Sequence, residues 1–346
     1  MNPGCYTALV TPFVEDGSEV DRDGLNQLAT FQIENGITGI LAVGTTGESP
    51  TLAWEEHNDV IEIIAKSTQG KCRCIAGTGS NNTKEALTAT RHAAQKGVDA
   101  VLLVDPYYNG PSSLEIRREY IAPIAEQTPG LDIIPYVIPG RTGAKLLPED
   151  LALLHQAYPN VKTVKEATGD LDNMRRTRAC CGPEFTILSG DDALVFDMMT
   201  DASIGAAGVI SVASNIAPKA MTDMVAALNG GNHAEAEALK NAVAPLFGLV
   251  TVTTQEETPH GQVDCRARNP LAIKTLMALL GMPVGPCRRP LGRMSRKGLD
   301  VVLSVARQVQ ANNPEIFRPL ADFFNIDVAD RLDTPAYRQG LFYESY

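Results

Sequence analysis

The stretch GILAVGTTGESPTLAWEEHNDVIEIIAKSTQGKCRCIA, residues 39–76, holds the pattern from which the fold can be predicted. It begins with an apolar run, Gly39–Val43, continues through a segment of helical period, Trp54–Ser67, and ends in a second short run, Arg73–Ala76. Short apolar runs are typical of buried parallel strands, and a helix of this length is the usual connection between two such strands. The stretch therefore predicts one βαβ unit.

The same alternation of short apolar runs and helical segments recurs along the first 230 residues, with eight strand candidates in all. The predicted strands are Tyr6–Val10, Gly39–Val43, Arg73–Ala76, Ala100–Val104, Asp132–Tyr136, Val161–Lys165, Phe185–Ser189 and Gly205–Ile210. The predicted helices include Arg22–Glu34, Trp54–Ser67, Thr83–Gln95, Ser113–Glu126, Pro148–Tyr158 and Asp170–Cys181. Eight βα units close a parallel sheet on itself, so we predict an α/β protein with a (β/α)8 TIM barrel over residues 1–230.

An open, doubly wound sheet is the alternative arrangement of such units. It would usually carry a glycine-rich nucleotide loop after its first strand, where this chain has Thr11-Pro12-Phe13 instead. The later turn Gly77-Thr78-Gly79 lacks the third glycine of a dinucleotide site. We therefore favour the barrel and expect no nicotinamide or flavin.

After Gly231 only helical periods remain, so residues 231–346 are predicted to form a C-terminal helical region. Its helix candidates are Asn232–Leu249, Pro270–Leu280 and Ser295–Gln310. The polar stretch Thr253–Arg268 and the tail Asn312–Tyr346 show no clear periodicity, and no structure is predicted for either.

The composition excludes several classes of partner. A formal net charge of −11 with a pI near 5.0 disfavours nucleic acid and anionic membrane surfaces. No export signal and no run of 18 apolar residues is visible. The seven cysteines form no spaced disulfide framework, and Cys72 and Cys74 have no second ligand cluster beside them. We therefore expect a cytoplasmic protein with reduced thiols and no bound metal.

Catalytic groups of a barrel lie at the carboxyl ends of its strands, and the most informative residue there is Lys165. Strand alternation places Thr163 and Lys165 on one side of their strand and Val164 on the other. If that side is the lumen, burial lowers the pKa of the amine and leaves it nucleophilic toward ketones. The alternative, which this segment alone leaves open, is a lysine at the rim paired with Glu166.

Further polar side chains end neighbouring strands. The phenol of Tyr136 would point into the same lumen and transfer protons, although tyrosine is also a common core residue. Thr45 and Thr46 lie in a glycine-flanked turn suited to a small carboxylate. Arg141 could bind a second carboxylate through two hydrogen bonds, or form an ordinary surface ion pair.

Seven segments together resemble the dihydrodipicolinate synthase and N-acetylneuraminate lyase family of class I aldolases. They are GTTGES (44–49), AGTGSN (76–81), DPYYN (105–109), PYVIPGRTG (135–143), VKEATGDL (164–171), LSGDDA (188–193) and GVISV (208–212). The resemblance covers residues 3 to 250 and resumes weakly from 269 to about 305. Relative to the family, Thr253–Arg268 resembles an insertion, and the chain past Gln308 extends beyond the usual end.

The resemblance implies a role for individual residues. Lys165 would form a Schiff base with pyruvate, and Tyr136, Thr45 and Tyr108 would relay protons, with Tyr108 reaching across a dimer interface. The residues implied to bind substrate are Thr46, Arg141 and Ile210. No cofactor or metal is implied, because the imine is made with the protein's own lysine. A homo-oligomer, either a dimer or a homotetramer, is implied as well.

The turn Pro139–Thr142 favours the branch of the family that condenses pyruvate with L-aspartate 4-semialdehyde, on the route to diaminopimelate and lysine. One alternative is an aldolase acting on N-acetylneuraminate or a 2-keto-3-deoxy sugar acid. Another is a pyruvate-binding regulatory protein without turnover. Feedback inhibition by L-lysine is also implied, at a second group of residues: Ser49, Pro50, Trp54, His57, Asn81, Glu85 and Tyr107.

Overall fold

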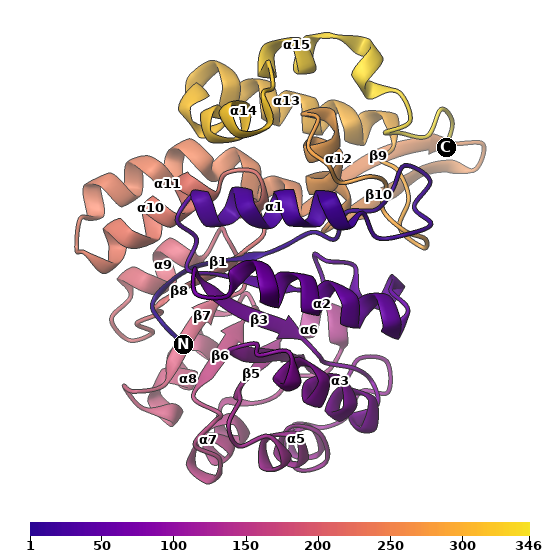
Figure 1. The fold of residues 1–346 in the computed structure, drawn as a ribbon. Helices are drawn as coiled ribbons and strands as arrows, with labels where there is room; N and C mark the ends of the chain where they lie inside the picture. Colours follow the sequence, from indigo (N-terminus) through magenta and orange to yellow (C-terminus); the bar gives the residue numbers. More distant parts are fainter.

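Eight parallel strands form a closed barrel in the computed structural model, which describes residues 1–346 (Figure 1). The strands are β1 (Gly4–Ala8), β2 (Gly39–Ala42), β3 (Arg73–Gly77), β4 (Ala100–Val104), β5 (Asp132–Val137), β6 (Thr163–Glu166), β7 (Thr186–Ser189) and β8 (Gly208–Ser211). Each strand pairs with the next, and β8 closes the sheet on β1 through pairs such as Tyr6 with Ile210. The predicted (β/α)8 barrel is confirmed.

Helices follow the strands and cover the outside of the barrel (Figure 1). They are α1 (Arg22–Glu34), α2 (Trp54–Thr68), α3 (Thr83–Gln95), α4 (Ser113–Glu115), α5 (Ala122–Gln127), α6 (Pro139–Thr142), α7 (Pro148–Ala157), α8 (Leu171–Cys181), α9 (Val195–Thr200) and α10 (Pro218–Asn229). Side chains of Asp21, Asn82 and Asp170 cap the helices that follow them by accepting backbone N–H groups. Local sequence thus sets several of the helix starts.

Some predicted boundaries are wrong by a few residues. The first strand begins at Gly4, two residues earlier than predicted, and the last at Gly208, three residues later, because the pairing of these two strands starts at Gly4 with Gly208. The predicted helix Ser113–Glu126 is interrupted by a π-helical segment, Ile116–Ile121, between α4 and α5.

The barrel strands separate two hydrophobic cores. Side chains that point inward form a small cluster in the lumen, and those that point outward pack against the helices in a cluster of 82 residues. The lumen cluster comprises Tyr6, Ala8, Leu41, Ile75, Ala100, Leu102, Ile134, Tyr136, Leu188 and Ile210. Burial on both faces explains why the strands appear in the sequence as continuous apolar runs.

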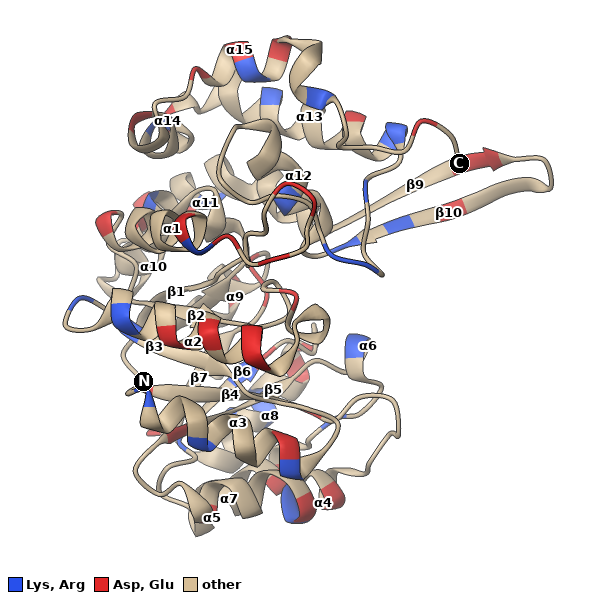
Figure 2. Cartoon of the chain, turned by 45° about the vertical axis from the view of Figure 1, so that its right-hand side comes forward, with Lys and Arg blue, Asp and Glu red and all other residues tan.

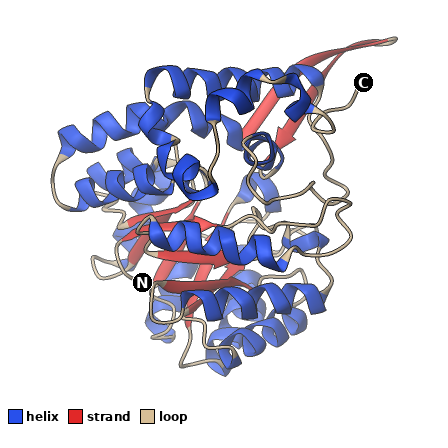
Figure 3. Ribbon diagram, turned by 45° about the horizontal axis from the view of Figure 1, so that its top comes forward, coloured by secondary structure: helices blue, strands red, loops and turns tan.

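The C-terminal region contains helices α11 (His233–Phe247), α12 (Leu271–Leu279), α13 (Arg296–Asn312), α14 (Arg318–Phe324) and α15 (Val328–Asp333). The stretch Thr253–Arg268, for which the sequence predicts no structure, belongs to an antiparallel hairpin of β9 (Thr251–Thr258) and β10 (Gly261–Arg268) within the otherwise helical region (Figures 2 and 3). Threonine and valine at the start of β9 favour a strand, and Gly261, at φ 112°, permits the turn.

The tail, for which no structure was predicted, packs back on the molecule. The ring of Phe31 on α1 lies 5.4 Å from that of Phe323 and 5.2 Å from that of Phe324. The guanidinium of Arg331 donates to the carbonyls of Ala278 and Leu279 at the end of α12. Arg331 pairs carbonyl groups that the end of α12 would otherwise leave without a donor, and the phenylalanine contacts bury aromatic surface. The tail is therefore part of the folded structure.

A buried ion pair links the C-terminal region to the barrel. The Nζ atom of Lys274 on α12 lies 2.7 Å from a carboxylate oxygen of Glu48, which follows β2, and the two side chains are 2% and 0% exposed. The amine also donates to the carbonyls of Thr11 and Pro286, and the second Glu48 oxygen accepts the N–H of Arg288. All three protons of the ammonium group are donated to oxygen atoms of the protein. These hydrogen bonds offset the free-energy cost of burying the two charges.

No helix of the structure combines the length and the apolar character that crossing a membrane requires. All seven cysteines are free thiols.

We predict that Lys274→Met lowers the free energy of unfolding by about 3–5 kcal/mol, because it leaves the Glu48 carboxylate buried without its partner. Chemical denaturation measures the change. The matched control is Lys219→Met, which removes an exposed pair with Asp223 and should cost at most about 1 kcal/mol. Equal losses in the two variants would contradict a special role for the buried pair.

Candidate active site

Lys165 and Tyr136 are neighbours on adjacent strands inside the lumen. The register of β5 and β6 pairs them directly, and Lys165 is only 4% exposed. The Nζ atom lies 4.2 Å from the centroid of the Tyr136 ring. The alternation predicted for this strand thus brings an amine and a phenol together at the carboxyl ends of the strands.

Glu166, the next residue, does not pair with this amine. Its carboxylate accepts the N–H of Thr168 at 2.7 Å and the side-chain amide of Asn173 at 2.9 Å. Successive residues of a strand point to opposite faces, so Glu166 is directed away from the lumen. The alternative reading of a rim lysine paired with Glu166 is therefore wrong.

Desolvation by burial lowers the pKa of Lys165 to about 7. The negative charge of Asp192 opposes this shift and raises the pKa, whereas the positive charge of Arg141 lowers it further. A substantial fraction of the amine is consequently neutral at neutral pH. A neutral amine carries the free electron pair that attack on a carbonyl carbon requires.

Two residues after β7 support this lysine and were not singled out from the sequence. A side chain at Gly190 would place its Cβ 3.1 Å from the Lys165 Cε and 2.8 Å from the Cβ of Ala167, so only glycine leaves room for the amine. The Asp192 carboxylate accepts the N–H groups of Val212 and Ala213. The signal in the sequence that could have identified Gly190 and Asp192 is their position just after a predicted strand.

The phenol of Tyr136 stays protonated at neutral pH. Burial raises its pKa to about 12, while the charge of Arg141 and a hydrogen bond with Thr45 act in the opposite direction. A phenol that retains its proton beside a hydroxyl can pass that proton to a reacting group and recover it afterwards.

A cavity of about 200 Å³ is lined by Tyr136, the neighbour of Lys165 on the adjacent strand. It is lined by residues that follow the strands, among them Thr45, Tyr107, Tyr136, Arg141 and Thr142. Its position at the carboxyl ends of the strands is where barrel enzymes carry their chemistry.

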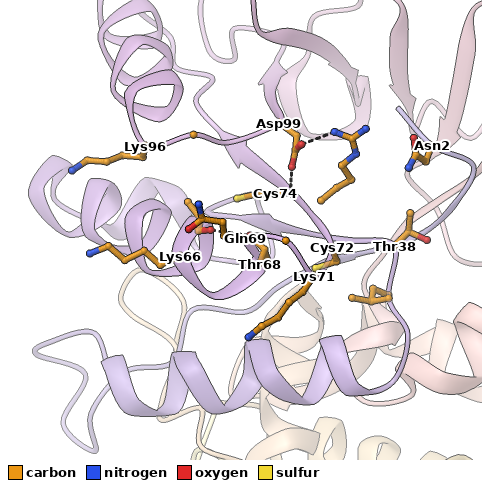
Figure 4. A pocket seen from close by; sticks show the side chains of 15 residues that line it. Asn2, Thr38, Lys66, Thr68, Gln69, Lys71, Cys72, Cys74, Lys96 and Asp99 are labelled. Carbon is orange, nitrogen blue, oxygen red and sulfur yellow. Dashed lines mark hydrogen bonds and ion pairs between the residues drawn. The ribbon is translucent and has the colours of Figure 1, made fainter.

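A larger pocket, of about 600 Å³, lies at the opposite end of the barrel (Figure 4). Its lining includes Asn2, Thr38 and Arg73, which precede or begin strands. Arg73 is paired with Asp99 and Lys96 with Glu62. Barrel enzymes carry their catalytic groups at the carboxyl ends of the strands, and this pocket lies at the amino ends. Its position and its paired charges both argue against catalysis in this pocket.

Thr46 and Arg141 both contact Asn269, which precedes α12. The hydroxyl of Thr46 accepts the side-chain amide of Asn269 at 2.9 Å, and the Arg141 guanidinium donates to the Asn269 carbonyl at 3.2 Å. No carboxylate of the chain pairs with Arg141, so its reading as a surface ion pair is wrong. The guanidinium faces the cavity with donors to spare.

Tyr108 does not join Lys165 within one chain, because its side chain is 94% exposed. Its backbone has φ 88°, a conformation that costs about 1–3 kcal/mol for a residue other than glycine. The neighbouring Tyr107 N–H is held by the Asn81 side chain at 2.7 Å. Ile210, by contrast, is buried in the lumen on β8.

Three of the seven residues predicted to bind L-lysine line the cavity. Ser49, Pro50 and Tyr107 line it, and Asn81 bonds to Tyr107. The ring of Trp54 packs against that of His57 at 5.0 Å, and burial lowers the pKa of His57 to about 4. The carboxylate of Glu85 accepts the hydroxyl of Ser80.

The chain is similar to known proteins over most of its length. The model of the dihydrodipicolinate synthetase family matches residues 1–309. The 4-hydroxy-tetrahydrodipicolinate synthase of Syntrophus aciditrophicus (strain SB) is 41% identical over 295 residues, which are 85% of this chain and 94% of that protein.

Two solved structures of such synthases are also similar to this chain. The 4-hydroxy-tetrahydrodipicolinate synthase of Methylacidiphilum fumariolicum SolV is 36% identical, with a TM-score of 0.81 over 92% of this chain and 100% of that one. DHDPS from Cyanidioschyzon merolae with lysine bound is also 36% identical, with a TM-score of 0.79 over 89% of this chain and 97% of that one.

We predict that the Lys165 amine reacts with an acylating reagent with a midpoint near pH 7, because burial lowers its pKa to about that value. Competitive acetylation across a pH series, read by mass spectrometry of the Lys165 peptide, measures the midpoint. In Asp192→Asn the midpoint should fall, because the carboxylate that raises this pKa is gone. A wild-type midpoint above about pH 9 would mean that the amine is not desolvated.

Proposed function

Since the chain belongs to the dihydrodipicolinate synthetase family, we propose that its barrel condenses pyruvate with L-aspartate 4-semialdehyde to 4-hydroxy-tetrahydrodipicolinate. The observation that carries the proposal is the desolvated Lys165 amine beside the Tyr136 phenol. A neutral amine, a proton donor and a small cavity are what imine formation with a short oxo acid requires.

The reaction begins when the Lys165 nitrogen attacks the carbonyl carbon of pyruvate. The carbinolamine loses water to give an imine, and removal of a methyl proton turns the imine into an enamine. The enamine carbon then adds to the aldehyde carbon of the semialdehyde. Finally, the amino group of the bound product attacks the imine carbon, which closes the ring and expels the Lys165 amine.

Tyr136 supplies and receives the protons of these steps, with Thr45 as its neighbour. Tyr108 completes the relay from a second copy of the chain. Two features of Tyr108 support this placement: its ring is exposed in the single chain, and its backbone is held at an unfavourable φ. Contact with a second copy of the chain would bury the exposed ring. The active form is accordingly a homo-oligomer, dimeric or tetrameric.

Thr46 binds the pyruvate carboxylate and Arg141 that of the semialdehyde, while Ile210 provides an apolar contact in the lumen. The guanidinium of Arg141 lines the cavity and has no carboxylate partner in the chain, which supports this role. No cofactor takes part, since the imine nitrogen itself accepts electrons from the pyruvate carbons. A cytoplasmic location remains a prediction from the cysteines.

Aldol cleavage of N-acetylneuraminate or of a 2-keto-3-deoxy sugar acid would share the imine chemistry. A cavity of about 200 Å³ favours substrates of three and four carbons over a long sugar acid. A protein that only binds pyruvate would need neither the lowered pKa of Lys165 nor the adjacent phenol.

We predict that borohydride added with pyruvate attaches a reduced adduct to Lys165, because reduction traps the imine. Mass spectrometry of the peptides locates the adduct. In a coupled assay, wild type should turn over pyruvate with the semialdehyde, and Lys165→Met should not. Cleavage of a sugar acid at a higher kcat/KM than this condensation would reject the proposed substrate pair, and an adduct on another lysine would reject the proposed nucleophile.

We further propose that L-lysine inhibits the enzyme at the group that includes Trp54, Glu85 and Tyr107. The relative from Cyanidioschyzon merolae was solved with lysine bound. Glu85 offers a carboxylate for an ammonium group, and the Trp54 ring offers an apolar wall for methylene groups. Tyr107 lines the cavity and precedes Tyr108, so a ligand that orders the first displaces the second.

Millimolar L-lysine should reduce wild-type turnover several-fold, since coupling between sites is typically about 1–3 kcal/mol. Glu85→Ala should abolish the inhibition and keep the uninhibited rate, because Glu85 contacts no substrate. The measurement is a titration of L-lysine at fixed concentrations of both substrates. Inhibition that persists in Glu85→Ala would place the ligand elsewhere, and an uninhibited wild type would refute the regulation.

A further inference from the structure

Two arginines hold the base of the β9–β10 hairpin against α6 in a reciprocal arrangement. Arg141 on α6 donates from Nη2 to the carbonyl of Asn269 at 3.2 Å. Arg268, the last residue of β10, donates from Nη2 to the carbonyl of Gly140 at 3.1 Å. Each guanidinium therefore contacts the backbone beside the other, which places Arg268 next to Arg141, a residue that lines the cavity.

Arg141 and Arg268 place two positive charges beside the cavity, although the chain carries a net charge of −11. Neither Arg141 nor Arg268 forms a hydrogen bond or an ion pair with a carboxylate. Beyond the effect of burial, the charges of Arg268 and Arg266 lower the pKa of Arg141. Figure 2 shows basic residues on β10 and on α6. Positive charge without a protein partner favours an anionic ligand.

Two buried polar atoms at this place have no partner in the protein. The Nε–H of Arg268 lacks an acceptor, and the Oδ1 of Asn269 lacks a donor. Asn269 is only 6% exposed, and its amide nitrogen already donates to the Thr46 hydroxyl. Buried polar atoms are nearly always paired, so the missing partners point to a ligand that offers an acceptor and a donor together.

We propose that Arg268 is a specificity-determining residue that binds, with Arg141, the carboxylate of the aldehyde substrate. An α-amino acid head supplies both missing groups: its carboxylate accepts from Arg268 Nε, and its ammonium donates to Asn269 Oδ1. Pyruvate has a carboxylate and no ammonium, so it satisfies only one of the two. The inference rests on the proposed function and extends it to the hairpin.

The competing explanation is that Arg268 only fastens the hairpin to the barrel. In that case, replacing Arg268 would lower the stability of the protein and change KM for both substrates alike. Loss of a substrate contact would raise KM for the semialdehyde and leave KM for pyruvate unchanged. Steady-state kinetics with each substrate varied in turn separates the two.

The experiment compares wild type with R268Q, R268K and R266Q. We expect R268Q to raise KM for the semialdehyde roughly 10-fold or more, the usual effect of losing a hydrogen bond to a charged group. Its KM for pyruvate and its borohydride trapping of pyruvate should stay within about two-fold of wild type, because these test only the first half-reaction. R268K keeps the charge without the planar donors and should show a smaller rise. R266Q, at an exposed position two residues earlier, should resemble wild type.

Several outcomes would overturn the inference. An unchanged KM for the semialdehyde in R268Q would do so, as would equal rises for both substrates. The same rise of KM for the semialdehyde in R266Q would indicate an effect of positive charge in general rather than a contact made by Arg268. If R268Q does not fold, R268K decides: a wild-type KM for the semialdehyde rejects the contact. A wild type that does not condense the two substrates rejects the proposed function itself, and this inference with it.

Discussion

The desolvation of a single amine is the constraint on which the rest of the site depends. Lys165 forms no ion pair in the lumen, and burial is the largest cause of the fall of its pKa to about 7. In the unfolded chain the same amine titrates near 10.4. From about pH 7 to about pH 10 the unfolded state therefore binds more protons, and the barrel gains stability as the pH rises. The active amine is maintained at the expense of stability at neutral pH.

The barrel supplies this environment through its closure, and the C-terminal region completes it. Alternation on β5 and β6 turns Tyr136 and Lys165 inward. The turn after β2, which carries Thr45 and Thr46, is then held from the other side by Lys274 and Asn269. One rigid sheet thus provides the nucleophile, and residues more than 200 positions later fix the turn above it.

Periodic features could be predicted from the sequence, whereas long-range pairings could not. The eight βα units and the inward face of β6 follow from spacing alone. The partnership of Glu48 with Lys274 joins residues 226 apart, and nothing local marks either one. The hairpin was missed because its threonines, charges and few buried positions form neither a helical period nor an apolar run. Tyr108 illustrates a different limit, since its implied place depends on a second chain.

The only tryptophan of the chain, Trp54, begins α2 beside the cavity. It is 40% exposed and packs on the His57 ring, with Ser49 and Pro50 a few residues earlier at the cavity rim. Indole emission depends on solvent contact, and no second indole contributes background. The molecule therefore carries a built-in fluorophore at its candidate regulatory surface, and a change in its emission would follow occupancy there without any label.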